Sequence, residues 1–202
     1  AVRIPGRDVW VGATGYAQRG GDVLTDAKGQ PLLDQYGLPR RQGARLMRPD
    51  DLMYVDSCSK THLAALVMRL VAERVLNLDD TLALWLPQCQ IPNADRITLR
   101  QMLNHTSGIY MLNTPEIRTY LRGKPNGPYP PLEMVGLVAG RTPFFEPGAT
   151  NRWEYSVSNY LLLGLVIEKA CGQSLARVTR DRLFRPLSLN HSYSAGLEPM
   201  PT

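Results

Sequence analysis

Apolar residues recur at helical spacing in the segment that follows Ser57. They are Leu63, Leu66, Val67, Leu70, Val71 and Val75. Because residues at i, i+3, i+4 and i+7 share one face, this pattern predicts an amphipathic helix packed on a core. Lys60 then lies one turn beyond Ser57 on the same face. Asp56 or Ser57 is the expected N-cap, which places the Ser57 hydroxyl at the positive end of the helix, where negative charge is stabilised.

A second helical pattern runs from Tyr160 to Cys171. Ser158 or Asn159 is its expected N-cap. Gly172 is its expected C-cap, because glycine readily adopts the left-handed conformation that ends many helices. A further helix is expected over residues 174–185, with the serine at its start as the cap.

The rest of the chain is poor in helical periodicity. Residues 1–19 predict the first hairpin, and residues 20–48, rich in Gly, Asp, Gln and Arg, predict a surface insertion loop. Residues 109–131 carry too many prolines and glycines for a continuous helix or strand. We therefore expect a single α+β domain over residues 1–202, in which residues 49–202 form a mainly helical lobe beside a small, incomplete antiparallel sheet.

Three polar residues in these segments suit nucleophilic catalysis. A serine hydroxyl is a weak nucleophile near neutral pH and needs a neighbouring base. Lys60, three residues after Ser57, is the candidate base, because burial and positive potential disfavour the charged form of a lysine. Taken alone, the Ser-x-x-Lys pattern is more typical of a capping serine followed by a solvated lysine. Taken alone, Tyr155 beside Trp153 is more typical of a buried tyrosine packed on its neighbour. Cys58 is an alternative nucleophile at the same helix start, although a core-facing thiol is the expectation.

Composition narrows the function classes. The 202 residues are 44% hydrophobic, which suffices for a core. A net charge of +5 and a pI near 9.3 suit acidic partners. However, no nucleic-acid-binding motif accompanies the arginines before Ser57, so a solvated loop and no nucleic-acid partner are expected. The three cysteines fit neither a zinc site nor a disulfide framework, so we expect free core thiols and no metal. No apolar run approaches the roughly twenty residues of a transmembrane segment.

Several segments follow one another in a fixed order. They are Leu76–Asp80, Ile97–Gly108, Pro147–Gly148, Tyr155–Gly164 and Leu183–Leu187. In this order and spacing they resemble the serine β-lactamase and penicillin-binding-protein superfamily, in the branch that holds class C β-lactamases, D,D-carboxypeptidases, D-aminopeptidases and esterases. The resemblance covers residues 9–189 and implies a β-lactamase/transpeptidase-like α+β fold. Most of the resembling families work outside the cytoplasm, which implies a periplasmic or secreted location.

The resemblance also implies a reaction. Ser57 would be the acylated nucleophile, Lys60 the proton acceptor, and Tyr155 the hydroxyl that passes a proton to the leaving group and activates water. The implied function is a serine hydrolase that forms an acyl-enzyme with a peptide, amide or ester, of D,D-peptidase, esterase or β-lactamase type, without metal or cofactor. The alternative is a catalytically impaired module that binds penicillin or cell-wall peptides. The expected substrate-binding residues are Tyr110, Trp153 and Val157.

Two departures from the family pattern change these expectations. In the family that the chain resembles, the residue two positions after the tyrosine is usually asparagine, where this chain has Val157. Valine makes no side-chain hydrogen bond, so an amide substrate should suffer more than an activated ester unless Ser158 or Asn159 compensates. The family's third motif, Lys-Thr-Gly or His-Thr-Gly on a C-terminal strand, has no match, since the similar letters at 105–108 belong to a different part of the pattern.

The missing motif leads us to expect a fragment, or one chain of a split protein whose second chain is the missing C-terminal segment. The resemblance implies two oxyanion donors, one of them from that strand. Losing one such donor costs about 3 kcal/mol, roughly a hundredfold or more in rate. This chain alone is therefore expected to be a poor catalyst.

Overall fold

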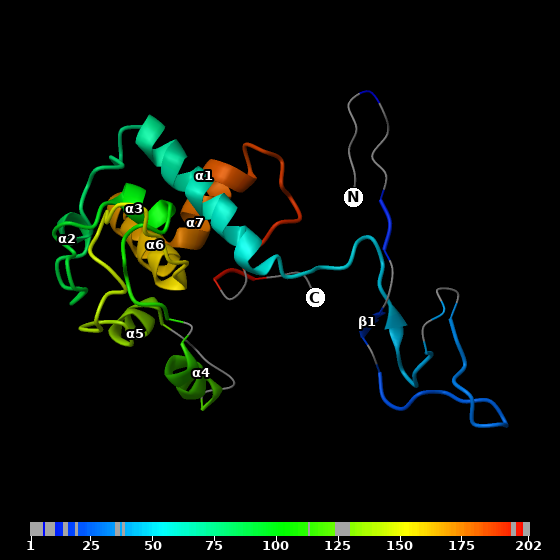
Figure 1. Ribbon diagram of the computed structural model, residues 1–202. Coiled ribbons are helices and arrows are strands. Elements are labelled where there is room, and N and C mark those ends of the chain that lie inside the picture. Colours follow the sequence, from blue (N-terminus) through cyan, green and yellow to red (C-terminus); the bar gives the residue numbers. More distant parts are fainter. Residues whose placement is uncertain are drawn as a thin grey trace. The chain divides into compact units, whose positions relative to one another are not determined.

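The computed structural model describes residues 6, 11–13, 16–18, 20–34, 37, 39–112, 114–123, 130–194 and 197–199. The chain divides into two compact units, residues 1–55 and residues 56–202 (Figure 1). Most of the predicted first hairpin lies outside the described residues.

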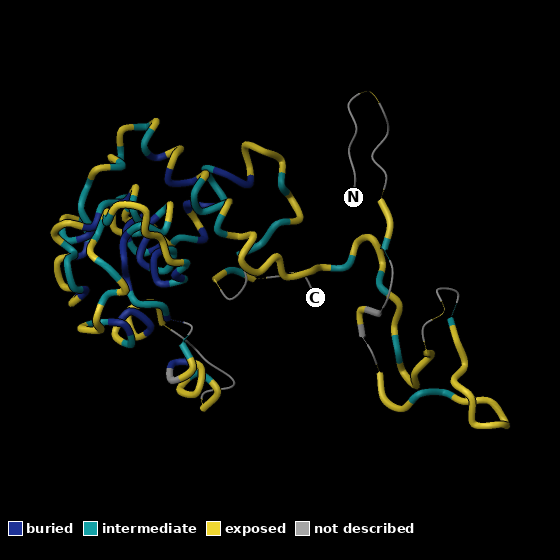
Figure 2. The backbone as a smooth tube through the Cα atoms, in the orientation of Figure 1, coloured by how far each residue is buried: buried dark blue, intermediate teal, exposed yellow. Residues whose placement is uncertain are grey.

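The first unit is a small set of paired loops. Its two strands, β1 (Tyr16–Gln18) and β2 (Arg45–Leu46), form an antiparallel pair with an irregular register. Single antiparallel bridges join the loops between them, at Val23 with Arg41, Thr25 with Pro31, and Leu33 with Pro39. Most of the described residues from 20 to 48 are exposed, as the yellow trace in Figure 2 shows. The predicted insertion therefore lies on the surface, and backbone bridges order it locally.

The second unit opens with the predicted amphipathic helix. A short 3₁₀ turn, Asp56–Cys58, leads directly into α1 (Ser59–Ala72). Leu66, Val67 and Leu70 are fully buried, which confirms the predicted apolar stripe. The predicted cap is wrong, because the helix begins after Cys58 and no side chain caps it. The Cys58 thiol is exposed and not core-facing, because it lies in the turn and outside the helix.

Two short helices follow on one side of the core. Thr81 and Thr98 form an antiparallel bridge, and each residue directly precedes a helix, α2 (Leu82–Trp85) and α3 (Leu99–Leu103). Thr98 and Gln101 form a capping box, in which the threonine hydroxyl accepts from the Gln101 amide and the glutamine side chain accepts from the Thr98 amide. This cap fixes the start of α3. The helix ends at Leu103, and residues 104–108 follow it directly.

Residues 109–131 are not one continuous helix, but they contain α4 (Pro115–Arg122). The expectation of an irregular segment overlooked that proline is well suited to the first helical position, where its missing N–H has no partner to lose. Helix α5 (Pro131–Gly136) starts with proline in the same way.

The long helix α6 (Val157–Cys171) forms the centre of the second unit and contacts α1, α2, α3, α5 and α7. Its residues Leu162, Leu163, Val166 and Ile167 are fully buried. Figure 2 draws the buried stretches of the second unit in dark blue. The predicted end at Gly172, in the left-handed conformation, is confirmed. The helix begins earlier than predicted.

The C-terminal part of the second unit contains a short α-helix followed by a π-helical turn. Helix α7 (Leu175–Thr179) starts at Ser174, whose side chain accepts a hydrogen bond from the Arg177 amide, as predicted. A π-helical turn, Arg180–Phe184, continues it and packs against α1. Within the described part of the chain, no helix is long and apolar enough to cross a membrane. The periplasmic or secreted location stays a prediction.

Candidate active site

Three polar residues meet at the start of α1, and one of them comes from a distant part of the sequence. Ser57 lies in the 3₁₀ turn, Lys60 in the first turn of α1, and Tyr155 two residues before α6. The Tyr155 hydroxyl lies 3.0 Å from Ser57 Oγ. Lys60 Nζ donates to the same Ser57 oxygen at 3.2 Å. Both hydrogen bonds converge on the Ser57 hydroxyl, which distinguishes this serine from the neighbouring Cys58.

The backbone holds Ser57 in a tight turn. Asp56, directly before it, has φ of 42°, in the left-handed region that costs a non-glycine residue about 1–3 kcal/mol. The Asp56 carbonyl accepts a hydrogen bond of 2.5 Å from the Ser59 hydroxyl, which closes the turn onto the helix. Further along α1, Leu66 and Leu70 are buried in the core. The nucleophile candidate is thus fixed relative to α6 and to the tyrosine before it.

Hydrogen bonds favour the ionised form of Tyr155. The pKa of its phenol is lowered, first by hydrogen bonding from Lys60 and then by the Ser57 hydroxyl. Lys60 Nζ also lies 5.3 Å from the centre of the Tyr155 ring and 5.8 Å from that of Tyr160. A phenol with a lowered pKa gives up its proton more readily. The arrangement can therefore move a proton away from Ser57 and deliver one nearby.

His105 is a member of this cluster that the sequence did not predict. Its ring lies 4.8 Å from the ring of Tyr155 and 5.5 Å from that of Tyr160, between centroids. Burial, and then the positive charge of Lys60, lower the pKa of the imidazole. The available signal was the stretch His105–Gly108, which sequence reasoning treated as structural.

The three predicted substrate-binding residues lie in different surroundings. Val157, the first residue of α6, is half-buried and packs against the core. The Tyr110 ring stacks on Phe144 at 5.4 Å. Trp153 is 68% exposed. Among these side chains, that of Trp153 is therefore the best placed to meet a ligand from solvent.

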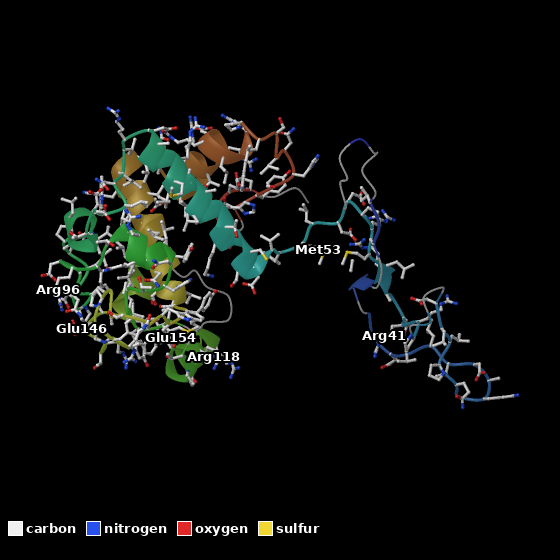
Figure 3. All side chains as sticks on the ribbon, turned by 45° about the horizontal axis from the view of Figure 1, so that its top comes forward. Arg41, Met53, Arg96, Arg118, Glu146 and Glu154 are labelled. Atoms are coloured by element: carbon white, nitrogen blue, oxygen red, sulfur yellow. The ribbon has the colours of Figure 1, made fainter. Side chains whose placement is uncertain are left out.

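Trp153 lines an open groove of about 560 Å³. The other lining residues are Thr106, Gly148, Ala149, Thr150, Asn151 and Arg152. An exposed ion pair of 2.6 Å joins Arg96 to Glu146 just before this stretch, and both residues are labelled in Figure 3. Because Thr106 follows His105 and Trp153 precedes Tyr155 by two residues, the groove adjoins the cluster along the chain.

Ser158 and Asn159 do not compensate for Val157. Both are fully buried inside α6, where the actual N-cap is Ser156. Ser158 Oγ donates to the Tyr110 carbonyl at 2.7 Å, and Asn159 Oδ1 accepts from Ser107 Oγ at 2.7 Å. Both side chains are engaged by the core and are not available to a substrate. Over the described residues, no group of three or more His, Cys, Asp or Glu side chains is placed to hold a metal ion.

The fold and the cluster define a protein of the Beta-lactamase family. The sequence model of that family matches residues 12–201, and the chain therefore belongs to it. Esterase EstB of Burkholderia gladioli is 32% identical, over 94% of this chain and 48% of its own length. Penicillin-binding protein 4 of Amycolatopsis lactamdurans is 31% identical, over 71% of this chain and 36% of its own.

Solved structures agree with the sequence relatives. A D-stereospecific amidohydrolase from Streptomyces is 30% identical, with a TM-score of 0.64 over 79% of this chain and 52% of its own. The D-amino acid amidase of Ochrobactrum anthropi is 26% identical, with a TM-score of 0.65 over 77% and 45%. The predicted β-lactamase/transpeptidase-like fold is confirmed. The chain spans less than half the length of the first curated relatives that it matches.

Proposed function

We propose that this chain carries the nucleophilic centre of a serine acyl hydrolase, which forms an acyl-enzyme at Ser57 with a peptide, amide or ester. The observation that carries the proposal is the convergence of Lys60 Nζ and the Tyr155 hydroxyl on Ser57 Oγ, at 3.2 Å and 3.0 Å. The names of its relatives, an esterase, a penicillin-binding protein and amidases, support the same class.

In this mechanism Ser57 Oγ attacks the carbonyl carbon while its proton passes to Lys60. Tyr155 then gives a proton to the leaving group as the carbonyl–leaving-group bond breaks, and its lowered pKa supports this acid role. In the second half, water attacks the ester carbonyl of the acyl-enzyme. One proton of that water passes to the Tyr155 oxygen, and Ser57 Oγ leaves as it takes back the proton held on Lys60. The cycle is balanced without a metal or cofactor.

The test is covalent labelling. The chain is incubated with a fluorophosphonate and with an activated acyl ester, and the intact mass and the modified peptide are read by mass spectrometry. An adduct on Ser57 is expected, absent in Ser57→Ala and strongly slowed in Lys60→Ala. Cys58→Ala is the matched control, because it changes the neighbouring nucleophile only and should keep the adduct. An adduct on Cys58, or one that survives Ser57→Ala, would exclude the proposed mechanism.

Turnover separates the two functions that share this centre. A hydrolase releases the acyl group, so product exceeds enzyme. A penicillin- or peptide-binding module stops at one acyl group per chain, or binds ligand equally well in Ser57→Ala. The observation that favours the second candidate is Val157, because its side chain packs against the core and offers no hydrogen bond.

We further propose that the preferred substrates are esters over amides. A site that hydrogen-bonds a substrate amide discriminates strongly, and Val157 removes one such contact. Initial rates with a chromogenic ester, a chromogenic cephalosporin and a D-amino acid anilide provide the comparison. Val157→Asn should raise amide turnover relative to ester turnover, and Val157→Leu is the control, because leucine is similar in size to asparagine but makes no side-chain hydrogen bond. Turnover of the cephalosporin alone by the unmodified chain would contradict this preference.

A further inference from the structure

The backbone at His105 adopts an unusual conformation next to the cluster. His105 follows the end of α3 at Leu103 by two residues and has φ of 63°, in the left-handed region. A non-glycine residue held there costs roughly 1–3 kcal/mol, and such residues concentrate at functional sites. The conformation carries the imidazole onto the rings of Tyr155 and Tyr160.

Hydrogen bonds fix the tautomer of the imidazole. The Ser156 backbone N–H donates to His105 Nδ1 at 3.2 Å, and a peptide nitrogen can only donate. Nδ1 therefore carries a lone pair, and the ring proton lies on Nε2. The Asn159 amide nitrogen lies 3.2 Å from the same Nδ1. Its orientation is set by Ser107 Oγ, which donates to Asn159 Oδ1 at 2.7 Å.

His105 accepts hydrogen bonds from the residues on both sides of Tyr155. The Glu154 N–H donates to the His105 carbonyl at 3.1 Å, and the Ser156 N–H donates to the His105 ring. The N–H groups of the two residues that flank the tyrosine are thus bound to one residue, while the imidazole lies against the phenol ring itself. Movement of His105 would move the hydroxyl that meets Ser57.

We propose, on the basis of the function proposed above, that His105 is a positioning residue, whose neutral imidazole and carbonyl clamp residues 154–156 and keep the Tyr155 hydroxyl within hydrogen-bond distance of Ser57. Catalysis is sensitive to such placement, since a displacement of about 1 Å costs roughly a hundredfold in rate.

The charge of the imidazole is part of the clamp. The ionisable groups that face it are Lys60 on α1, Tyr155 before α6 and Tyr160 within α6. Protonation at Nδ1 would set an N–H against the Ser156 and Asn159 donors and add a positive charge beside Lys60. The clamp therefore opens as the pH falls through the pKa of His105, which burial and Lys60 both lower.

A pair of substitutions tests the clamp without changing the backbone requirement. His105→Asn keeps an acceptor at the Nδ1 position, His105→Gly removes it, and both residue types tolerate a positive φ. We expect His105→Gly to lower kcat/KM for an activated ester about 10- to 100-fold, mainly in kcat, and His105→Asn to stay within severalfold of the unmodified chain. The exposed His191→Gly is the control and should change nothing.

Two further readouts separate positioning from stability and from the proposed function. The pH profile of the unmodified chain should show an acid-side loss of kcat/KM that follows the His105 NMR titration and is absent in His105→Asn. The absorbance of tyrosinate, which needs no turnover, should show the early ionisation of Tyr155 displaced to higher pH in His105→Gly. Full activity with an unchanged Tyr155 titration in His105→Gly, or equal impairment of both variants, would overturn the proposal. Absence of Ser57 labelling in the unmodified chain would refute the hydrolase but leave the Tyr155 titration to decide the clamp.

Discussion

Gly108, on the loop that follows α3, has no room for a side chain, and its replacement by alanine is the sharpest stability prediction for this chain. Gly108 has φ of 74°, and a Cβ built on it would lie 2.0 Å from the carbonyl oxygen of Phe145. Real Cβ atoms essentially never approach a neighbour within 3.0 Å. The atom in the way is backbone, and the adjacent Phe144 N–H donates to the Gly108 carbonyl at 2.8 Å. The backbone of residues 144–145 would have to move by about 1 Å.

The expected loss has three parts. An alanine at positive φ costs about 1–2 kcal/mol. Forcing an extra carbon into a filled site adds about 1–3 kcal/mol, and loss of the Gly108–Phe144 hydrogen bond adds about 1 kcal/mol. Gly108→Ala should therefore lower the free energy of unfolding by about 3–6 kcal/mol. Gly140→Ala is the matched control, because Gly140 has φ of 67° but no atom within 4 Å of its Cβ position. Gly140→Ala should therefore lower the free energy of unfolding only by the cost of the positive φ, about 1–2 kcal/mol.

Urea unfolding followed by circular dichroism measures both variants, with thermal unfolding as a check. At about 2–4 °C per kcal/mol, Gly108→Ala should lower Tm by roughly 10 °C and Gly140→Ala by roughly 4 °C. The difference between the two variants isolates the contact with Phe145 from the cost of the positive φ. Equal losses would refute the steric argument, since the backbone would then have moved aside without cost.

Three further outcomes follow from the local environments of single residues. Tyr155 should ionise below the ordinary tyrosine range, because Lys60 and Ser57 lower the pKa of its phenol, and Tyr155→Phe should delete that early step from the tyrosinate absorbance titration. The pKa of His105 is lower in the folded chain than in the unfolded one. Its stabilising contribution is therefore present above the ordinary histidine pKa and is lost as the pH falls through the pKa of the folded state. Urea unfolding at several pH values should show this loss of unfolding free energy toward low pH, and His105→Asn should remove it. The exposed Cys58 should react with a thiol reagent in the native state, whereas the buried Cys89 should react only on unfolding.

Periodicity predicted the helices that depend on local pattern and burial. The stripe through Leu66 and Leu70 was predictable because a helix buries every third or fourth residue, and those residues are fully buried. The N-caps were predictable only where a polar side chain met a free backbone amide. Ser174 does so, whereas Ser57 lies in a preceding 3₁₀ turn whose left-handed Asp56 no periodicity reveals.

The site was predictable as far as motifs are ordered along the chain. The sequence named Ser57, Lys60 and Tyr155, and the fold brings their reactive atoms together. It did not give His105 a part in this cluster, because the contacts of His105 with Tyr155 and Ser156 join residues about fifty positions apart in the chain. Its left-handed backbone is one that histidine adopts more often than most non-glycine residues, but no pattern in the neighbouring sequence predicts it at this position.

The position of Val157 shows why the residues next to it cannot supply the hydrogen bond that the valine side chain lacks. Successive residues at a helix start point in directions about 100° apart, so Val157, Ser158 and Asn159 face different surroundings. Ser158 and Asn159 are both fully buried and hydrogen-bonded to the segment from Ser107 to Leu112. Turning either toward a substrate would break a buried hydrogen bond and leave its partner unsatisfied, at about 1–3 kcal/mol. A new amide is therefore least costly at position 157 itself, where the side chain is only half-buried, and this makes Val157→Asn the informative substitution for distinguishing an esterase from an amidase.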